Sequence, residues 1–427
     1  MSCSVVIGAQ WGDEGKAKMI DFFSQNADII VRYQGGANAG HTVVANGEKH
    51  VFHLIPSGIL HPGKICVLGN GVVLDPMQLQ KEMDNLTAQS IDINYRLLIS
   101  DAAHLILPYH KALDSALEEL RSNKIGTTGR GIGPCYADKC LRTGIRVGDI
   151  FLDEKTLEKK VRQTLEVKNL QLVKMHKKDP FSIEEIMDII LDFKKHTQKM
   201  IINTGYYLNE EAKKNKTIIL EGAQGFGLDI DHGTYPFVTS SNPTIGGALL
   251  GSGLNHSVID KVIGISKAYI TRVGEGPFPT EDFGDDGNTL RDKGGEYGST
   301  TGRPRRCGWF DVELMKQTAR ICGLTDITLT KIDVLSGFEK VKVAVGYEYK
   351  GKKIDMFPSY LLDDIKPIYE ELDGWTEDIS ECKSYEDLPQ NTRDYIDFLE
   401  KSVGVPMSII SVGPDRENTI VRDIWQQ

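Results

Sequence analysis

Long hydrophobic runs are absent from this sequence, which limits the classes of protein it can belong to. No segment of its 427 residues approaches the ~20 consecutive apolar residues that a membrane-spanning helix needs. The amino terminus enters a strand-like apolar segment without the basic region, long apolar core and cleavage pattern of a signal peptide. We therefore expect a soluble protein in the cytoplasm that does not engage a membrane.

Cysteine pairs and an excess of positive charge are also missing. The seven cysteines are scattered and include no Cys-X-X-Cys pair, which argues against a disulfide framework or a cysteine zinc site. There are 50 Lys and Arg against 60 Asp and Glu, and the net charge of -10 would repel a nucleic-acid polymer. A single nucleotide needs only a local positive pocket, so this balance leaves nucleotide binding open.

The sequence has no internal repeat, low-complexity tract or Pro/Ser-rich linker, so we expect one large domain spanning residues 1–427. Short β-branched runs alternate with amphipathic segments, which predicts an α/β fold with a mostly parallel central sheet flanked by helices. The predicted strands are 4–7, 29–33, 64–68, 217–220, 327–330 and 408–412, and the clearest helices are 110–121 and 311–322. A charge-rich, glycine-free stretch at about 153–200 predicts a helical insertion, and 341–357 predicts a small antiparallel hairpin.

Glycine is plentiful, at 43 residues, and it gathers in clusters. The first cluster, residues 8–17 (GAQWGDEGKA), lies between a predicted strand and a predicted helix. Backbone N–H groups in such a turn can surround phosphate oxygens, and Lys16 adds a positive charge. The segment is P-loop-like but irregular, because its glycines are further apart and Ala17 replaces the Ser or Thr that holds Mg²⁺. Asp13 and Glu14 would repel a phosphate unless a cation or a catalytic task explains them; an ordinary turn with solvated acids is the alternative.

Two more loops have compositions suited to ligand binding. Residues 34–42 (QGGANAGHT) follow a strand, where ligands of open α/β sheets bind, and His41 can exchange a proton near neutrality. Residues 126–133 (GTTGRGIG), with Arg142 nearby, combine hydroxyls, free amides and a guanidinium that suit a phosphate monoester. A structural histidine and a plain surface loop are the alternatives.

Three later segments complete the set. In residues 221–225 (EGAQG), the amide of Gln224 could read a base edge, and Thr239 beyond it could bind phosphate. Residues 299–306 (STTGRPRR) bring three guanidiniums beside hydroxyls, which indicates an anionic substrate or, alternatively, a solvated basic patch. In residues 330–333 (TKID), an aspartate could accept from both N1–H and the exocyclic amine of guanine and so favour GTP over ATP.

Taken together and in this order, the six segments resemble the adenylosuccinate synthetase family. The resemblance extends over residues 5–423 and is carried mainly by QWGDEGK, NAGHT, GTTGRGIG and TTGRPRR. It implies a homodimeric, Mg²⁺-dependent, GDP-forming ligase that joins IMP and L-aspartate, using GTP, into adenylosuccinate. The reaction would pass through 6-phosphoryl-IMP and commit IMP to AMP.

The resemblance also implies roles for particular residues, grouped by ligand. The catalytic group is Asp13 (general base), His41 (acid), Lys16 and Gln224. The GTP group is Gly12, Asp13, Glu14, Gly15, Lys16, Ala17, Lys18, Gly40, His41, Thr42, Arg305, Lys331, Ile332, Asp333, Ser411, Val412 and Gly413. The IMP group is Asp13, Glu14, Gly15, Lys16, Asn38, Ala39, Gly40, His41, Thr128, Gln224, Thr239, Arg303 and, from the other subunit, Arg142. The aspartate group is Ser299, Thr300, Thr301, Gly302, Arg303, Pro304 and Arg305, and Mg²⁺ would be held by Asp13 and the carbonyl of Gly40.

The sequence departs from the family pattern at two positions. Ala17 stands where the family commonly has glycine, and Ala37 stands where many members have a larger polar residue. If residue 17 needed a positive φ, alanine would be strained there, but a helix starting at this point predicts a helical φ.

Two other functions fit parts of the pattern: a GTPase-type regulatory module and a non-catalytic nucleotide-binding scaffold.

Overall fold

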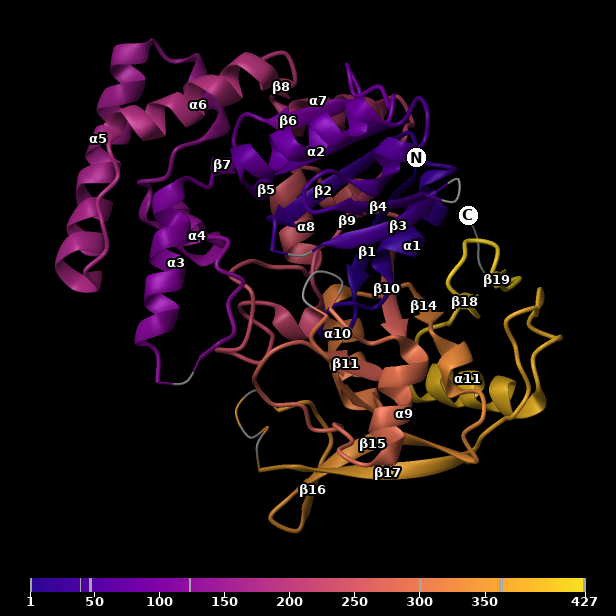
Figure 1. Ribbon diagram of the computed structural model, residues 1–427. Coiled ribbons are helices and arrows are strands. Elements are labelled where there is room, and N and C mark those ends of the chain that lie inside the picture. The colour runs from indigo at the N-terminus through magenta and orange to yellow at the C-terminus, as the bar shows by residue number, and fades with distance from the viewer. Residues whose placement is uncertain are drawn as a thin grey trace.

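The computed structural model describes residues 2–38, 40–45, 48–122, 124–298, 302–358, 360, 362 and 364–424, and for residues 2, 41–45, 48 and 49 it describes the backbone alone. A large central sheet runs through the molecule (Figure 1). Among the described residues it has 11 strands, and all neighbours pair in parallel except the last two, β18 and β19. In spatial order the strands are β19 (Thr419–Val421), β18 (Ile409–Ser411), β14 (Asp326–Thr330), β10 (Lys261–Lys267), β1 (Ser2–Gly8), β9 (Thr217–Glu221), β2 (Ile29–Gly35), β5 (Ile65–Leu74), β6 (Leu97–Ser100) and β8 (Ile201–Ile202), with β7 (His104–Leu105) beside β5.

The central strands are apolar on both faces, as a sheet covered on both sides requires. In β1, Val5 and Ile7 belong to one buried cluster and Val6 to another. Helices α7 (Thr204–Lys213) and α8 (Ile245–Ser252) contribute to the first cluster, and α1 (Lys16–Ser24) and α2 (Pro76–Ala88) to the second. The predicted α/β class with a mostly parallel sheet is therefore confirmed.

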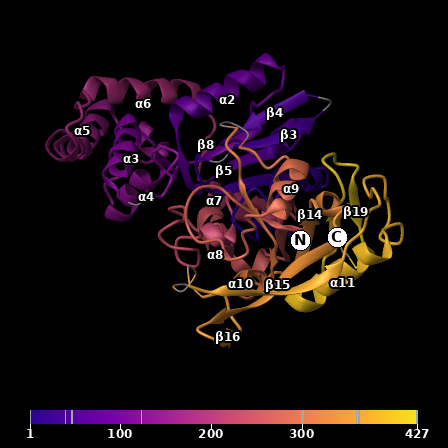
Figure 2. The same ribbon diagram turned by 60° about the horizontal axis from the view of Figure 1, so that its bottom comes forward.

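A group of helices lies together at one side of the molecule, as Figures 1 and 2 show. These helices are α3 (Pro108–Leu120), α4 (Ile132–Leu141), α5 (Glu154–Leu170), continued by a π-helical turn (Gln171–Met175), and α6 (Ile183–Thr197). The segment predicted as a helical insertion thus forms α5 and α6, which pack on α3 and α2. We propose that it is an insertion within one domain spanning residues 1–427.

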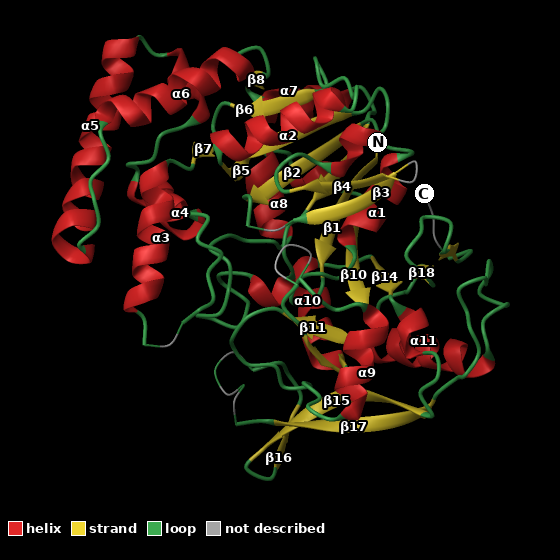
Figure 3. Ribbon diagram, in the orientation of Figure 1, coloured by secondary structure: helices red, strands yellow, loops and turns green. Residues whose placement is uncertain are grey.

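A second, smaller sheet lies at the end of the molecule away from α6 (Figure 3). It contains β13 (Phe310–Asp311), β15 (Lys340–Tyr349), β16 (Lys352–Ile354) and β17 (Lys366–Asp373). The predicted hairpin is β15 and β16, but its second strand ends at Ile354 rather than 357. β17 pairs along most of β15, so the hairpin is part of a larger sheet. β17 was not predicted, because its largely exposed side chains lack the alternation of buried and exposed residues that marks a strand.

The remaining elements connect these two sheets or lie beside them. They are β3 (His41–Ala45), β4 (Glu48–Phe52), β11 (Ile270–Arg272), β12 (Arg306–Gly308), α9 (Asp285–Gly294), α10 (Val312–Cys322), α11 (Gln390–Val403) and the 3₁₀ turns Ser57–Leu60, Val147–Phe151, Phe226–Leu228, His256–Val258 and Ile332–Leu335. None of the helices in the described residues is long and apolar enough to cross a bilayer.

Candidate functional site

The predicted site segments share one edge of the central sheet. Parallel strands present their carboxyl ends at a common edge, where loops of open α/β sheets bind ligands. Four of the six predicted segments begin at or next to such an end, and so does the loop of residues 411–413 from the predicted GTP group. These ends are Gly8 of β1, Gly35 of β2, Glu221 of β9, Thr330 of β14 and, for residues 411–413, Ser411 of β18. The fold therefore brings together loops that are up to about 400 residues apart in the sequence.

The loop after β1 has the backbone shape of an anion-binding turn. Gly12, Asp13 and Gly15 all have positive φ, at 92°, 58° and 88°. α1 begins directly afterwards at Lys16, so the loop ends at a helix N-terminus, where backbone N–H groups and the helix dipole favour negative charge. Ala17 lies inside α1 and is not among the described residues with positive φ. The alanine at this departure from the family pattern is therefore unstrained.

Glu14 is fully buried and supports the loop from inside. Its Oε1 accepts hydrogen bonds from the backbone N–H groups of Gln10 (3.0 Å) and Gly12 (2.8 Å), and its Oε2 lies 2.6 Å from Lys16 Nζ. Gly225 leaves room for this carboxylate, because a Cβ there would clash with Glu14 Oε1 and would also lie 2.6 Å from both the Gln10 carbonyl oxygen and the Gly12 nitrogen. The hydrogen-bonding capacity of the Glu14 carboxylate is thus used by residues of the loop itself.

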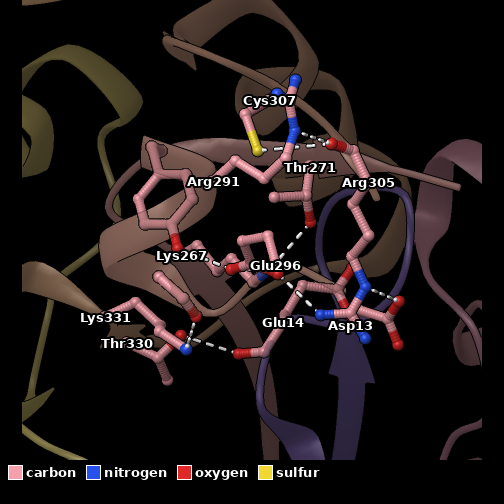
Figure 4. A network of polar contacts seen from close by, with 12 residues as sticks. Asp13, Glu14, Lys267, Thr271, Arg291, Glu296, Arg305, Cys307, Thr330 and Lys331 are labelled. Atoms are coloured by element: carbon pink, nitrogen blue, oxygen red, sulfur yellow. Dashed lines mark hydrogen bonds and ion pairs between the residues drawn. The ribbon is translucent and has the colours of Figure 1, made fainter. Parts of the chain in front are cut away.

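Asp13 points the other way and is held by an arginine from a distant segment. Its side chain is 40% exposed, and its Oδ2 lies 2.9 Å from Arg305 Nε. The same guanidinium places Nη1 2.6 Å from Oε2 of Glu296 (Figure 4). Although burial opposes it, the negative charges of Asp13 and Glu296 raise the pKa of Arg305 above its usual value. Arg305 therefore connects the loop after β1 to Glu296, which lies just before the 299–306 motif.

Glu296 was missed by the sequence reasoning, and it is the centre of a buried network. Lys267 Nζ (2.7 Å) and Tyr269 Oη (2.5 Å) both donate to its Oε1, and Lys267 also donates to Thr271 (2.7 Å). Burial alone would raise the pKa of Glu296, but Lys267 and these hydrogen bonds outweigh it and lower the pKa to about 2. A lysine at the end of an otherwise apolar strand was the one signal that could have found this network.

A second lysine, Lys18 of α1, connects the end of the loop after β1 to residues 411–413 of the predicted GTP group. Lys18 Nζ donates to Ser411 Oγ (2.6 Å) and to the carbonyl of Gly413 (2.8 Å). Burial lowers the pKa of Lys18 to about 8, against the opposing effect of nearby acids such as Asp333. Burial also raises the pKa of Asp333 itself. Thr330 Oγ1 donates to the Glu14 carbonyl (2.7 Å), so the end of β14 is fixed to the same loop.

Two predicted IMP ligands contact each other. Gln224 Nε2 donates to Asn38 Oδ1 (3.2 Å), and Gln224 Oε1 accepts from Gln34 Nε2 (3.0 Å). The amide chain joins the loops after β2 and β9, and Gln224 adopts a φ of 60° at its tight turn. Thr239 is half-buried further along the chain.

The other predicted residues lie at the surface or outside the described part of the chain. Thr128, Arg142, Gly302, Arg303 and Pro304 are exposed, and Arg303 Nη2 lies 3.6 Å from Glu275 Oε1. Arg306, the third guanidinium of its motif, is paired with Glu281 and bonds the Gly276 carbonyl (2.7 Å), so its role is structural. Lys331 donates to the Gly294 carbonyl (2.6 Å), and Ile332 and Val412 are buried beside these loops. Ala39, Ser299, Thr300 and Thr301, and the side chains of His41 and Thr42, lie outside the described residues.

The residues expected to hold Mg²⁺ offer the ligand type it prefers. Within the described residues, no cluster of three or more His, Cys, Asp or Glu side chains could form a metal site. Asp13 nevertheless presents an exposed carboxylate, and Gly40 has a backbone carbonyl. Mg²⁺ is usually bound by one or two protein oxygens together with substrate phosphates and water, so this donor set fits.

Fold and site together define an α/β protein with a modified P-loop at the carboxyl ends of parallel strands. The family model for adenylosuccinate synthetase matches residues 5–420. The chain therefore belongs to the adenylosuccinate synthetase family, which confirms the resemblance read from its motifs and the expectation that it is an enzyme.

Relatives and solved structures agree with this assignment along the whole chain. The chain is 52% identical over 427 residues to adenylosuccinate synthetase of Halothermothrix orenii and 50% identical over 425 residues to that of Syntrophobacter fumaroxidans; each alignment covers 99% of both chains. A structure of fully ligated adenylosuccinate synthetase from Plasmodium falciparum superposes with a TM-score of 0.91 at 38% identity, covering 98% of this chain and 99% of that one. The succinoaminodeoxyadenylate synthetase of cyanophage S-2L, bound to dGMP and dATP, shares the fold at a TM-score of 0.63 and 18% identity, covering 98% and 95%.

Proposed function

We propose that this chain joins IMP and L-aspartate, using GTP, to form adenylosuccinate, GDP and phosphate. The observation that carries the proposal is the exposed carboxylate of Asp13 within an anion-binding loop, held in place by Arg305. A carboxylate that only repelled phosphate would be a liability at this position, so a proton-transfer role explains it. The membership of the chain in the family supports the same reaction.

The chemistry proposed for Asp13 starts from a poor leaving group. The oxygen at C6 of hypoxanthine is amide-like, so an amine cannot displace it directly at a useful rate. If Asp13 removes the N1 proton, negative charge moves to O6, which attacks the γ-phosphorus of GTP and releases GDP. The aspartate amine then attacks C6 of 6-phosphoryl-IMP and loses a proton as phosphate leaves. His41 would donate a hydrogen bond to the oxygens that gain charge during phosphoryl transfer.

The loops around Asp13 would bind GTP. The N–H groups of residues 12–18 and 40–42, with the charge of Lys16, would hold its phosphates. Arg305 would add a guanidinium on the same side. Asp333, next to the loop of residues 411–413 that Lys18 holds, would accept from guanine and select GTP over ATP. Mg²⁺, held by Asp13 and the carbonyl of Gly40, would offset the negative charge of the phosphates and of the carboxylate beside them.

The amide chain and the arginines would bind the other two substrates. Gln224 and Asn38 are already in contact, so their amides would meet IMP as a preformed pair. Thr128, Thr239 and Arg303 would complete the IMP site. The segment 299–305 would hold aspartate, whose two carboxylates suit arginine.

Arg142 would complete the IMP site of a second subunit. It lies exposed at the C-terminus of α4, and apolar side chains are exposed on the same group of helices: Leu117 (44%), Leu120 (67%) and Leu141 (65%). Exposed apolar side chains on one group of elements are typical of a protein interface. We therefore propose a homodimer in which each site takes Arg142 from the partner.

The test of the catalytic proposal is Asp13→Asn. This variant should fold, as judged by circular dichroism, and should lose adenylosuccinate synthesis measured by absorbance. Near-normal turnover would rule out Asp13 as the base. Wild-type hydrolysis of GTP without IMP and aspartate would favour a GTPase module, and nucleotide binding without product in wild-type protein would favour a scaffold.

Mixed dimers test the shared site. At an IMP concentration near the wild-type KM, Arg142→Leu and Asp13→Asn subunits are each expected to show little or no activity alone. In a mixed dimer, one site combines an intact Asp13 with the partner's intact Arg142, so random assortment should restore about a quarter of wild-type activity. No recovery in dimers carrying both variants would rule out the contribution of Arg142 across the interface.

A further inference from the structure

A buried polar network joins α3, α4 and α5 beside Arg142. At its centre is Asp138 of α4, whose side chain is fully buried. Its Oδ2 lies 2.9 Å from Nε2 of His110 on α3, and its Oδ1 is bonded to Nζ of Lys168 on α5. None of these three side chains has a role in the proposed reaction, although burying charged groups is costly unless they are paired.

The hydrogen bonds define the charges in this network. His110 Nδ1 accepts from the Leu107 N–H (2.9 Å), so Nε2 carries the proton and donates to Asp138. Burial lowers the pKa of His110, which keeps its imidazole neutral. Burial alone would raise the pKa of Asp138, but the hydrogen bonds from His110 and Lys168 outweigh it and lower the pKa. The charged pair is therefore Asp138 and Lys168.

The same residues fix the turn that contains Arg142. The N–H groups of Thr143 (3.0 Å) and Gly144 (3.2 Å) both donate to the Asp138 carbonyl, and the Thr143 hydroxyl donates to Asp138 Oδ1 (3.3 Å). From α5, Thr164 Oγ1 donates to the Thr143 carbonyl (2.8 Å). Arg142 itself has a φ of 64°, a left-handed conformation that residues other than glycine rarely adopt and that persists only when the surroundings hold it.

Two side chains of α5 thus act on one turn. Thr164 and Lys168 are four residues apart, which places them on the same face of the helix. Thr164 binds Thr143, the residue after Arg142. Lys168 binds Asp138, whose main chain and side chain both hold Thr143. The direction in which the Arg142 side chain leaves α4 is set by this turn, because φ and ψ of a residue fix the orientation of its Cα–Cβ bond.

We propose that α5, through Lys168 and Thr164, positions Arg142 to bind the phosphate of IMP in the neighbouring subunit. This inference rests on the proposed function, and it assigns a task to the helical segment of residues 153–200. Lys168 and Thr164 are positioning residues that touch no substrate.

The first measurement is the steady-state kinetics of Lys168→Met. Misplacement of a binding group by about an ångström can cost up to about a hundredfold. We expect KM for IMP to rise tenfold or more, with kcat and the KM values for GTP and aspartate within twofold of wild type. Lys159→Met removes an exposed lysine of the same helix, and all its constants should remain those of wild type.

Mixed dimers distinguish positioning across the interface from a general structural effect. Differently tagged Lys168→Met and Asp13→Asn subunits are co-expressed, and dimers carrying both tags are purified. Their one competent site takes Asp13 from the Lys168→Met subunit and Arg142 from the other, where Lys168 is intact. KM for IMP should therefore return to the wild-type value, and a KM that stays raised would overturn the inference.

Two further measurements keep the outcomes separate. Arg142→Leu mixed with Asp13→Asn is run in parallel; failure of that pair to regain activity would count against the shared site itself, not against α5 alone. Because Lys168→Met leaves Asp138 buried without its charged partner, Thr164→Val, which keeps the shape of the side chain and removes one hydroxyl, is measured as well. We expect a smaller rise in KM for IMP in the same direction. A folded, dimeric Thr164→Val with wild-type KM for IMP would overturn the proposal.

Discussion

Replacing Glu296 by glutamine tests whether the buried network behind Asp13 stabilises the folded chain. Glutamine keeps the shape of the side chain but removes its charge. Lys267, itself fully buried, then loses its counter-charge, and Arg305 loses one of its two carboxylate partners. The variant should fold, but with a lower free energy of unfolding.

The size of the loss follows from the pKa of Glu296. Its pKa is lowered from 4.5 to about 2 in the folded chain, and a difference of about 2.5 pH units corresponds to about 3 kcal/mol at neutral pH. Breaking a buried ion pair by removing one partner costs a similar amount, about 3–5 kcal/mol. Because the folded pKa is the lower one, this contribution is complete above pH 4.5 and is lost as the pH falls toward 2.

Urea unfolding at pH 7, followed by circular dichroism, measures this loss directly. At the average entropy of unfolding per residue, about 3 kcal/mol would lower Tm by about 3 °C in a chain of this length. Glu370→Gln, at an exposed position of β17, should change the free energy of unfolding by less than about 0.5 kcal/mol. Adding Lys267→Met to Glu296→Gln should cost less than the sum of the two single changes. Wild-type stability in Glu296→Gln, or strict additivity in the double variant, would refute the reasoning.

Three other perturbations address the loops. The pKa of Lys18 is about 8 because of burial, so kcat/KM for GTP should fall as the pH rises through 8 and the side chain loses its charge; a profile unchanged by Lys18→Arg would contradict this. Gly225→Ala should destabilise the chain by about 1–3 kcal/mol in the same urea assay, because the added Cβ would clash with Gln10 and Gly12. Gly246→Ala is the control: the space around its Cβ is open, so this change should be neutral or stabilising. Arg303→Leu should raise KM for IMP and aspartate together, and unchanged values for both would remove Arg303 from the site.

The sequence predicted those parts of the fold whose signal is local. β1, β2, β9 and β14 are buried β-branched runs that end where glycine or polar residues begin, and the structure has them within one or two residues of the predicted bounds. β17 was not predicted because its exposed side chains show no alternation; pairing with β15 makes it a strand. Tertiary pairing of this kind leaves no mark on a short window of sequence.

The sequence predicted which loops meet in the site, but not which side chains connect them. The post-strand loops could be expected to meet, because parallel strands end at one edge. The side-chain contacts that connect those loops could not be predicted. Lys18 and Ser411 were both predicted to bind GTP, but no motif predicted that they contact each other, and neither Glu296 nor its partner Lys267 lies in a recognisable motif. A charged residue in a buried strand indicates that a partner exists, but not which one.

Asp13 and Glu14 show why two identical charges in one motif need a structure to separate them. As a pair of acids in a phosphate-type loop they pose one problem, electrostatic repulsion of the ligand. The positive φ of Asp13 turns its side chain outward to Arg305, and the next residue turns inward, where Gln10, Gly12 and Lys16 surround the carboxylate. Glu14 is thereby neutralised by the loop it supports and shielded from a bound phosphate. The electrostatic repulsion expected from the sequence then concerns Asp13 alone. Because Asp13 is exposed and is held in place by Arg305, it is the acid for which a chemical role has to be found.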